Sequence, residues 1–206
     1  MSELSTLAPM RGVLLVIPPE LLAERALTGV DRRDEMWEGE LHMAPAASSD
    51  HAWRAGLWVG ALAPLARALG LRVLIEAGLF DPTVPSLTSW RVPDVVLASP
   101  EHISKRGIEG RAAFVIEVRS PDDESYDKLS FYARVGVEEY LIYDPDRGII
   151  DLFHLVGRTL RPVERDTNGW FRSTRLGIGI RLVGDNTDQQ RTEIQLPNGT
   201  IVDLDS

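Results

Sequence analysis

Two acidic residues stand where the sequence otherwise predicts core β-strands. Asp94 follows Pro93 in the apolar run Val92 to Ala98, and Glu117 lies at the end of the run Ala112 to Val118. A buried acid without a partner costs several kcal/mol, and two acids on neighbouring strands repel each other. A hard cation with oxygen ligands would relieve that repulsion. The pair therefore predicts a site for Mg²⁺, with Mn²⁺ as a substitute ion, which suits metal-assisted phosphodiester hydrolysis.

The same residues also allow a purely structural interpretation. Asp94 could cap a turn, and Glu117 could pair with Arg119 at the end of its strand. A pattern of two acids is short, so spacing alone does not decide between a metal site and these local contacts.

The first element expected to position this chemistry is a long helix from Asp50 to Leu69, with Ser49 as its N-cap and Gly70 as its stop. Pro64 is expected to kink or interrupt it. A spacing of four predicts one apolar stripe, made of Trp53, Leu57, Ala61, Leu65 and Leu69.

Several β-branched, apolar runs predict the sheet. The runs Val92 to Ala98 and Ala112 to Val118 have the composition of strands that are buried on both faces. A helix is expected from Ser120-Pro121 to about Val135, with Gly136 as its stop. Further strands are expected at Met36–Met43, Arg72–Phe80, Glu139–Tyr143 and Ile149–Leu155.

This order of elements predicts an α/β (α+β) fold: a mixed central sheet flanked by helices, with additional antiparallel hairpins towards the C-terminus. Residues 1–30 are predicted to be an N-terminal extension, with Val13–Ile17 extended and a short helix after Pro18-Pro19. Residues 31–206 are predicted to form a single domain.

The composition excludes several classes of protein. The chain has no cysteine, which excludes disulfides, thiolate zinc sites and a cysteine nucleophile. No apolar run is long enough to span a membrane, and the apolar stretch near Val13 lacks a cleavage site, so the cytoplasm is the expected location. His42, His102 and His154 show no metal-ligand spacing.

The charge distribution speaks against extensive contact with nucleic acid. The net charge is −9, which opposes binding to a polyanion. Residues 157–181 hold six arginines against two acids, so this stretch alone is basic. It could contact phosphates, but a solvated, salt-bridged surface is the preferred interpretation.

Several motifs in the same order resemble those of the Uma2 (DUF820) family of restriction-endonuclease-like proteins, which is assigned to the PD-(D/E)XK nuclease superfamily. The motifs are Arg91–Val96, Phe114–Pro121, Asp127–Leu129 and Tyr132–Tyr140, with Trp37–Leu41, Pro45 and His51 upstream and Leu176-Gly177 downstream. The resemblance covers roughly Asp34 to Val202. It implies the superfamily fold, a magnesium site and a nuclease-type active site.

One position departs from the superfamily pattern. The pattern has a lysine two residues after the glutamate, and here that residue is Arg119, which can stabilise negative charge but cannot act as a general base. Lys128 matches a lysine of the family and could take over this role. The alternative interpretation of Lys128 is structural: an i,i+4 ion pair with Glu124 on a solvated helix face.

The resemblance suggests two further site residues. Glu38 matches the acidic position before a glycine and is a candidate third acid, although Glu35 and Glu40 flank it. His51 matches a family histidine that could orient a water or contact phosphate, or it could simply lie in solvent at the start of its helix.

Two main functions remain open from the sequence, beside a weaker third one, the hydrolysis of another phosphate ester in the same metal site. The first is a Mg²⁺-dependent DNA endonuclease in which Asp94 and Glu117 bind the metal. The second is a catalytically inactive relative that serves as an interaction or DNA-contacting module, which the net charge and Arg119 favour. A homodimer is expected because duplex DNA has two strands and two-fold dimers are the commonest oligomers.

Overall fold

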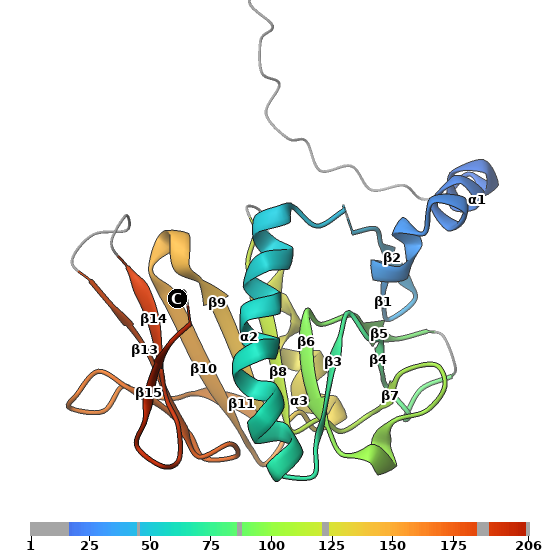
Figure 1. Ribbon diagram of the computed structural model, residues 1–206. Coiled ribbons are helices and arrows are strands. Elements are labelled where there is room, and N and C mark those ends of the chain that lie inside the picture. Colours follow the sequence, from blue (N-terminus) through green and yellow to red (C-terminus); the bar gives the residue numbers. More distant parts are fainter. Residues whose placement is uncertain (1–16, 45, 86–87, 121–123, 185–189, 205–206) are drawn as a thin grey trace, which may run out of the picture.

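The computed structural model describes residues 17–44, 46–85, 88–120, 124–184 and 190–204 (Figure 1). The α-helices of these residues are α1 (Pro19–Thr28), α2 (Ser49–Ala68) and α3 (Leu129–Val135). Short 3-10 helices are η1 (Val30–Arg33), η2 (Pro100–His102), η3 (Ser125–Lys128) and η4 (Pro145–Arg147). Most of the predicted extended segment Val13–Ile17 lies outside the described residues.

The strands of the described residues form three sheets. The central sheet has the order β11 (Thr159–Pro162), β10 (Ile149–Val156), β9 (Glu139–Asp144), β8 (Phe114–Val118), β6 (Val95–Ala98) and β3 (Arg72–Ile75). A second sheet has the order β2 (Glu40–His42), β1 (Glu35–Trp37), β5 (Trp90–Arg91), β4 (Leu79–Phe80) and β7 (Ile108–Glu109). The third has the order β12 (Phe171–Ser173), β13 (Ile178–Val183), β14 (Arg191–Gln195) and β15 (Ile201–Asp203).

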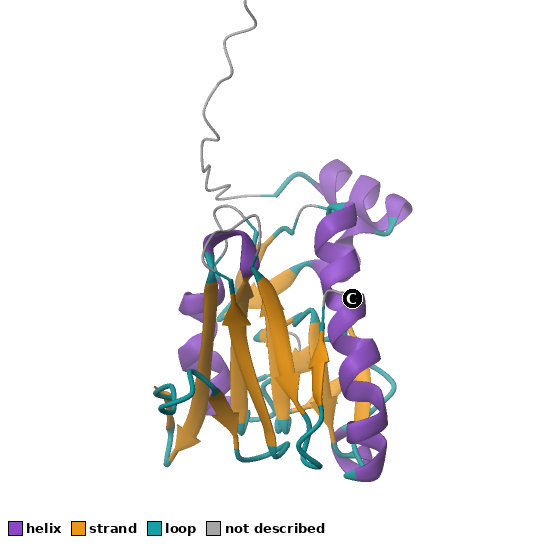
Figure 2. Ribbon diagram, turned by 60° about the vertical axis from the view of Figure 1, so that its left-hand side comes forward, coloured by secondary structure: helices purple, strands orange, loops and turns teal. Residues whose placement is uncertain are grey.

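The central sheet is mixed, as predicted, because β8 and β9 run parallel whereas the other neighbouring strands are antiparallel. Helices lie on both sides of it (Figure 2). The core of one face joins α2 and the third sheet to the inward residues of β6 and β8, and the core of the other face contains α3. The predicted mixed sheet flanked by helices is therefore confirmed.

Alternation along the strands decides which side chains meet which helix. In β8, Phe114 and Ile116 belong to the core on the α2 side, whereas Val115 belongs to the core on the α3 side. Since successive side chains of a strand point to opposite faces, Glu117 shares the α3 side with Val115. Both faces of β8 are buried, which explains its continuous apolar composition.

The predicted stripe of α2 is wrong in its register. The buried residues are Ala55, Trp58, Leu62 and Ala66, whereas Trp53 is 67% exposed. With 3.6 residues per turn, rows spaced by four drift around the helix, and the neighbouring row faces the sheet. The predicted N-cap is also wrong by one residue, because the side chain of Ser48 accepts a hydrogen bond from the backbone N–H of His51 at 3.2 Å.

Pro64 does not interrupt α2, which is continuous from Ser49 to Ala68. A proline leaves the carbonyl of the residue four positions earlier without its helical donor. That residue is Gly60, which is exposed like Pro64, so water can solvate the carbonyl.

Two predicted strands are each split in two. The run Arg72–Phe80 divides at Glu76, whose φ of 49° breaks the extended backbone, so β3 and β4 enter different sheets. The predicted strand Val92–Ala98 is shorter than expected and begins only at Val95, as β6, because Pro93 has no N–H to donate. The predicted strand Met36–Met43 is a hairpin of β1 and β2, because Glu38 and Gly39 both have positive φ at its turn.

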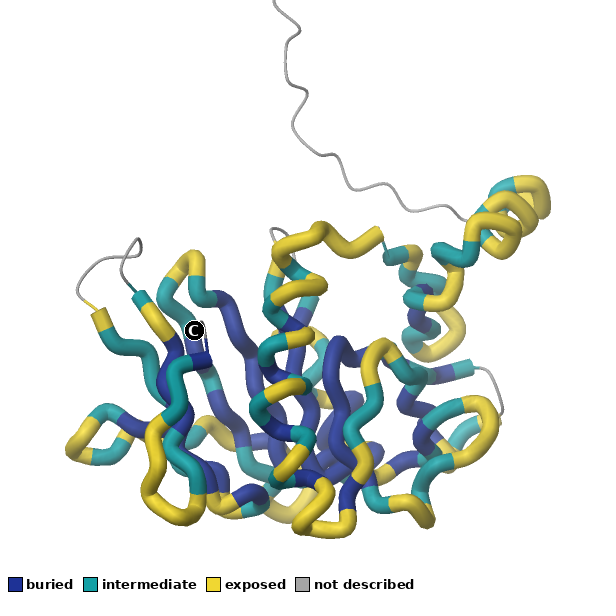
Figure 3. Tube along the Cα trace, viewed as in Figure 1, coloured by how far each residue is buried: buried dark blue, intermediate teal, exposed yellow. Residues whose placement is uncertain are grey.

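The N-terminal segment is held weakly. None of the residues of α1 is buried (Figure 3). Arg25 connects it to the rest of the chain through Asp34 and the carbonyl of Ala44. None of the described helices combines the length and the apolar character needed to cross a membrane.

Candidate active site

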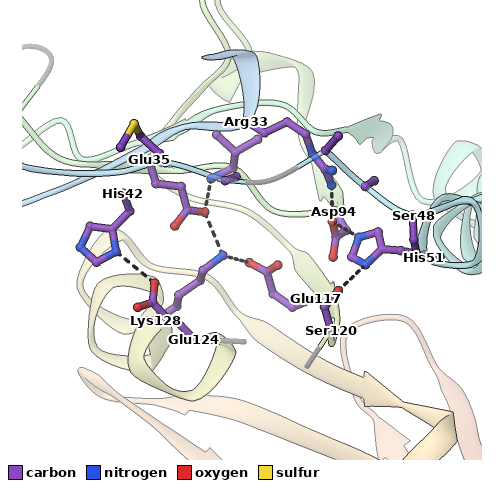
Figure 4. Close-up of a pocket in the computed structure, with 15 residues that line it drawn as sticks. Arg33, Glu35, His42, Ser48, His51, Asp94, Glu117, Ser120, Glu124 and Lys128 are labelled. Carbon is purple, nitrogen blue, oxygen red and sulfur yellow. Dashed lines mark hydrogen bonds and ion pairs between the residues drawn. The ribbon is translucent and has the colours of Figure 1, made fainter. Parts of the chain in front are cut away.

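A cavity of about 530 Å³ lies where β6 begins and β8 ends, next to the first turn of α2. Figure 4 shows the side chains that converge on it from the hairpin β1–β2, from η1 and from η3. The lining residues are Arg33, Glu35, His42, Met43, Ala44, Ala46, Ala47, Ser48, His51, Val92, Asp94, Glu117, Ser120, Glu124 and Lys128.

The strand register brings Asp94 and Glu117 together. Val95 is opposite Ile116 in the antiparallel pair of β6 and β8, so one further step places Asp94 opposite Glu117. The carboxylate of Asp94 accepts a hydrogen bond at 2.8 Å from the backbone N–H of Val118. The two predicted metal ligands therefore lie side by side at one end of the strands.

Glu117 is buried and receives two hydrogen bonds on a single oxygen. Lys128 Nζ lies 3.0 Å and Tyr132 Oη 2.6 Å from Glu117 Oε1. Burial is the main cause that raises the pKa of Glu117 from 4.5 to about 8. The nearby charges of Asp94 and Glu35 raise this pKa further, whereas the ammonium and the phenol lower it.

Lys128 joins two acids from different elements. Its Nζ donates to Glu35 Oε1 at 2.8 Å as well as to Glu117. Burial alone would lower the pKa of the Lys128 ammonium, but the charges of both carboxylates raise it above its ordinary value. The group therefore stays cationic at neutral pH. The alternative pair with Glu124 does not form, because Glu124 contacts His42 instead, with 3.0 Å between Oε2 and Nδ1.

Asp94 is held by three donors. Besides the Val118 amide, His51 Nε2 lies 2.7 Å from Oδ1, and the Arg33 guanidinium lies 3.3 Å from the same oxygen. The other ring nitrogen of His51 lies 3.3 Å from the Ser120 hydroxyl. His51 is therefore in the cavity, where it orients Asp94, and does not lie free in solvent.

The hairpin places Glu35 in the cavity, whereas the predicted third acid, Glu38, points elsewhere. Glu38 is at the hairpin turn, its side chain is 56% exposed, and it pairs with Arg134 and Arg91. Glu35 accepts hydrogen bonds from the backbone N–H of Val92 at 2.8 Å and from Lys128. The position of the turn decides this, because Glu35 lies in β1, whereas Glu38 is a turn residue with a φ of 50° and lies outside the strand.

Arg119 also lies outside the cavity. It follows the last residue of β8, and its guanidinium lies 3.6 Å from Asp144 and over the ring of Tyr126. Lys128 is thus the ammonium that the structure places beside the paired acids. The roles of these residues remain predictions.

Three of the six arginines in the basic stretch form salt bridges with described residues. Arg172, Arg175 and Arg181 pair with Asp166, Glu138 and Glu193 respectively. These contacts favour the interpretation as a solvated surface.

The cavity offers oxygen donors of the kind that a divalent cation needs. Among the residues that the structure describes, no group of three His, Asp or Glu side chains has a geometry suited to hold a metal ion. Mg²⁺, however, commonly uses one or two carboxylates and keeps several waters. Asp94 and Glu117 supply two, and Oε2 of Glu117 accepts no hydrogen bond from the described residues. The pair therefore fits a hydrated hard cation better than a closed three-ligand site.

Comparison with known proteins adds the family and the fold. The Uma2 family model, described as "Putative restriction endonuclease", matches residues 20–183. A solved structure described as "a putative nuclease belonging to DUF820 from Anabaena variabilis ATCC 29413" has a TM-score of 0.55, covering 70% of this chain and 83% of that chain. The two sequences are 14% identical, so the likeness concerns the fold, and it confirms the nuclease-like architecture. A search of curated proteins gives no match.

Proposed function

The chain belongs to the Uma2 family, and from this membership and the geometry of its cavity we propose that it is a Mg²⁺-dependent endonuclease that hydrolyses phosphodiester bonds of DNA. The observation that carries the proposal is the meeting of Asp94, Glu117 and Lys128 in one cavity, although one directly precedes β6, one lies in β8 and one ends η3. A fold maintained only for stability has little use for two adjacent acids that repel each other on buried strands.

Each residue has a defined task in this proposal. Asp94 and Glu117 hold the ion, and the bound ion would polarise the phosphoryl group and lower the pKa of a coordinated water. Lys128 stabilises the negative charge that develops on the phosphate oxygens, since its ammonium remains protonated. Glu35 fixes the position of that ammonium through its 2.8 Å hydrogen bond.

His51 is proposed as a positioning residue. Its contact with the Ser120 hydroxyl leaves Nε2 to donate to Asp94, so the ring fixes the orientation of one metal ligand. The Arg33 contact, at 3.3 Å the longest of those to Asp94, is the one that an incoming cation would weaken first.

The test is titration calorimetry of Mg²⁺ and Mn²⁺ into the wild type and Asp94→Asn, followed by incubation of the same samples with supercoiled plasmid. Metal uptake and plasmid nicking are expected in the wild type, with both lost in the variant. Glu38→Gln is the matched control, because it also removes one negative charge but lies outside the cavity. Nicking by Asp94→Asn at the wild-type rate would refute the assignment.

A catalytically inactive interaction module is the second candidate. The net charge of −9 and the pairing of Arg119 with Asp144 favour it. Whether or not such a module binds DNA, it would take up no metal and would not nick the plasmid. The same experiment therefore separates the two functions.

A further inference from the structure

Four flat groups are layered between the protein core and the cavity. The guanidinium carbon of Arg91 lies 4.3 Å from the ring centroid of the fully buried Phe131 and 4.1 Å from the ring centroid of Trp37. Trp37 stacks on His42 with ring centroids 4.2 Å apart and planes 11° from parallel. His42 lines the cavity and is the outermost layer, with 28% of its side chain exposed.

Hydrogen bonds fix the layers of this stack in place. Arg91 donates to the carbonyl of Met36 at 2.7 Å, and Trp37 Nε1 donates to Glu35 Oε2 at 2.8 Å. The Nδ1 of His42 lies 3.0 Å from Glu124. A ring that is already immobilised loses little conformational entropy when a ligand stacks on it. The arrangement is therefore suited to present one flat surface to the cavity.

The charges around the cavity make such a surface useful. Its lining contains two permanent cations, Arg33 and Lys128, and both are already paired with acids. Binding of duplex DNA depends mainly on cations that neutralise phosphates, and this lining offers few. Stacking of a base on an aromatic side chain is less dependent on charge and works for every base.

We propose that His42 is a stacking platform for an unpaired nucleobase, so that the substrate of the site is single-stranded DNA or a frayed duplex end. This rests on the proposed nuclease function and names the form of DNA that it uses. Trp37 covers one face of the imidazole, and among the described residues no second aromatic ring stacks on the other. A base next to the cleaved phosphate would occupy that face.

The test measures binding of a fluorescein-labelled single-stranded oligodeoxynucleotide by fluorescence anisotropy, with Ca²⁺ in place of Mg²⁺ to suppress cleavage. His42→Ala is expected to weaken binding about tenfold or more, the usual effect of losing one stacked base. His42→Phe keeps a flat ring and is expected to bind within about threefold of the wild type. Trp53→Ala is the matched control, because Trp53 is an aromatic residue that is 67% exposed and lies outside the cavity lining.

Two further substrates complete the test: the duplex of the same sequence, and the same strand carrying abasic sites. Both should bind the wild type more weakly than the intact single strand. Equal binding of the duplex, equal binding of the abasic strand, or unchanged binding by His42→Ala would each overturn the stacking platform. Melting curves of His42→Ala and His42→Phe verify that both variants fold.

The outcomes separate this inference from the function on which it rests. Plasmid nicking that requires Asp94, together with wild-type binding by His42→Ala, overturns the platform alone. Single-strand binding that depends on His42, with neither the plasmid nor the bound single strand cleaved in Mg²⁺, overturns the nuclease activity and supports the platform. Absence of both binding and nicking overturns both.

Discussion

Replacing Lys128 by methionine tests whether its ammonium holds the site together electrostatically. The substitution keeps most of the side-chain volume but leaves Glu35 and Glu117 without their shared cation. The side chains of the two acids are 8% and 5% exposed, so water cannot easily replace it. Removal of one partner from a buried ion pair costs about 3–5 kcal/mol. At roughly 2–4 °C per kcal/mol for a chain of this size, the melting temperature should fall by about 6–20 °C.

The loss of stability in Lys128→Met should depend on pH, and the titration of Glu117 gives the direction of this dependence. Its pKa is raised to about 8 in the folded protein, from 4.5, so the folded state binds a proton that the unfolded state releases between these values. The stability linked to this group is fully present below pH 4.5 and is lost as the pH rises through about 8. Without Lys128 this pKa should rise further. Lys128→Met should therefore lose more of its unfolding free energy at pH 8.5 than at pH 5.

The assay is thermal and urea unfolding of the wild type and Lys128→Met at both pH values. Arg54→Met is the control, because it breaks a pair with the 70% exposed Asp146 and should cost less than about 1 kcal/mol. The double variant Lys128→Met with Glu117→Gln should recover part of the loss. A drop of equal size at pH 5 and pH 8.5, or no drop at all, would refute the electrostatic account.

Three further predictions concern the Tyr132 hydroxyl, the protons released on Mg²⁺ binding, and the buried Asp81. Tyr132→Phe removes the buried hydrogen bond to Glu117 and should cost about 1–3 kcal/mol in urea unfolding, while weakening Mg²⁺ binding in calorimetry. Mg²⁺ binding near pH 7 should release protons, because Glu117 must ionise. Calorimetric titration in two buffers of different ionisation enthalpy measures the proton release, and a binding heat that is the same in both buffers would contradict the prediction. Burial would raise the pKa of Asp81, but hydrogen bonds from Thr83 and Arg134 lower it. The stability that ionised Asp81 gives to the folded state is therefore present above pH 3.8 and is lost as the pH falls through the lowered pKa. Asp81→Asn should therefore destabilise at pH 7 by about 1–3 kcal/mol and much less near pH 3, as pH-dependent unfolding would reveal.

The sequence predicts the central part of the site well because strand periodicity is a local rule. Asp94 and Glu117 interrupt apolar strands that are next to each other, and period-two alternation then determines their common face. Lys128 could be proposed only by resemblance. Its contact with Glu117 depends on how η3 folds back over the strand end, which no local pattern encodes.

The errors have physical causes of the same kind. The resemblance selects Glu38 because it directly precedes Gly39, and only the hairpin shows that Glu35 faces the cavity instead. The stripe of α2 was displaced by one row because Leu57 and Trp58 are both apolar, and contact with the sheet selects between the rows. Tertiary packing decides which acid faces the cavity and which row of α2 faces the sheet, and neither residue propensity nor sequence periodicity encodes that packing.

The ammonium of Lys128 reaches the site from η3, whereas the sheet places the two carboxylates beside it. The sheet sets the spacing of Asp94 and Glu117, which hydrogen bonding between β6 and β8 makes rigid. The reach of Lys128 is set by how α3 packs, and Phe131 is a fully buried contact of that packing. A change of side-chain volume at Phe131 would therefore shift the Lys128 ammonium together with the Tyr132 hydroxyl, and both donate to Glu117 Oε1. Substitutions at this buried contact, which is not part of the cavity lining, are thus a way to alter the hydrogen bonding of Glu117 without changing any residue of the cavity itself.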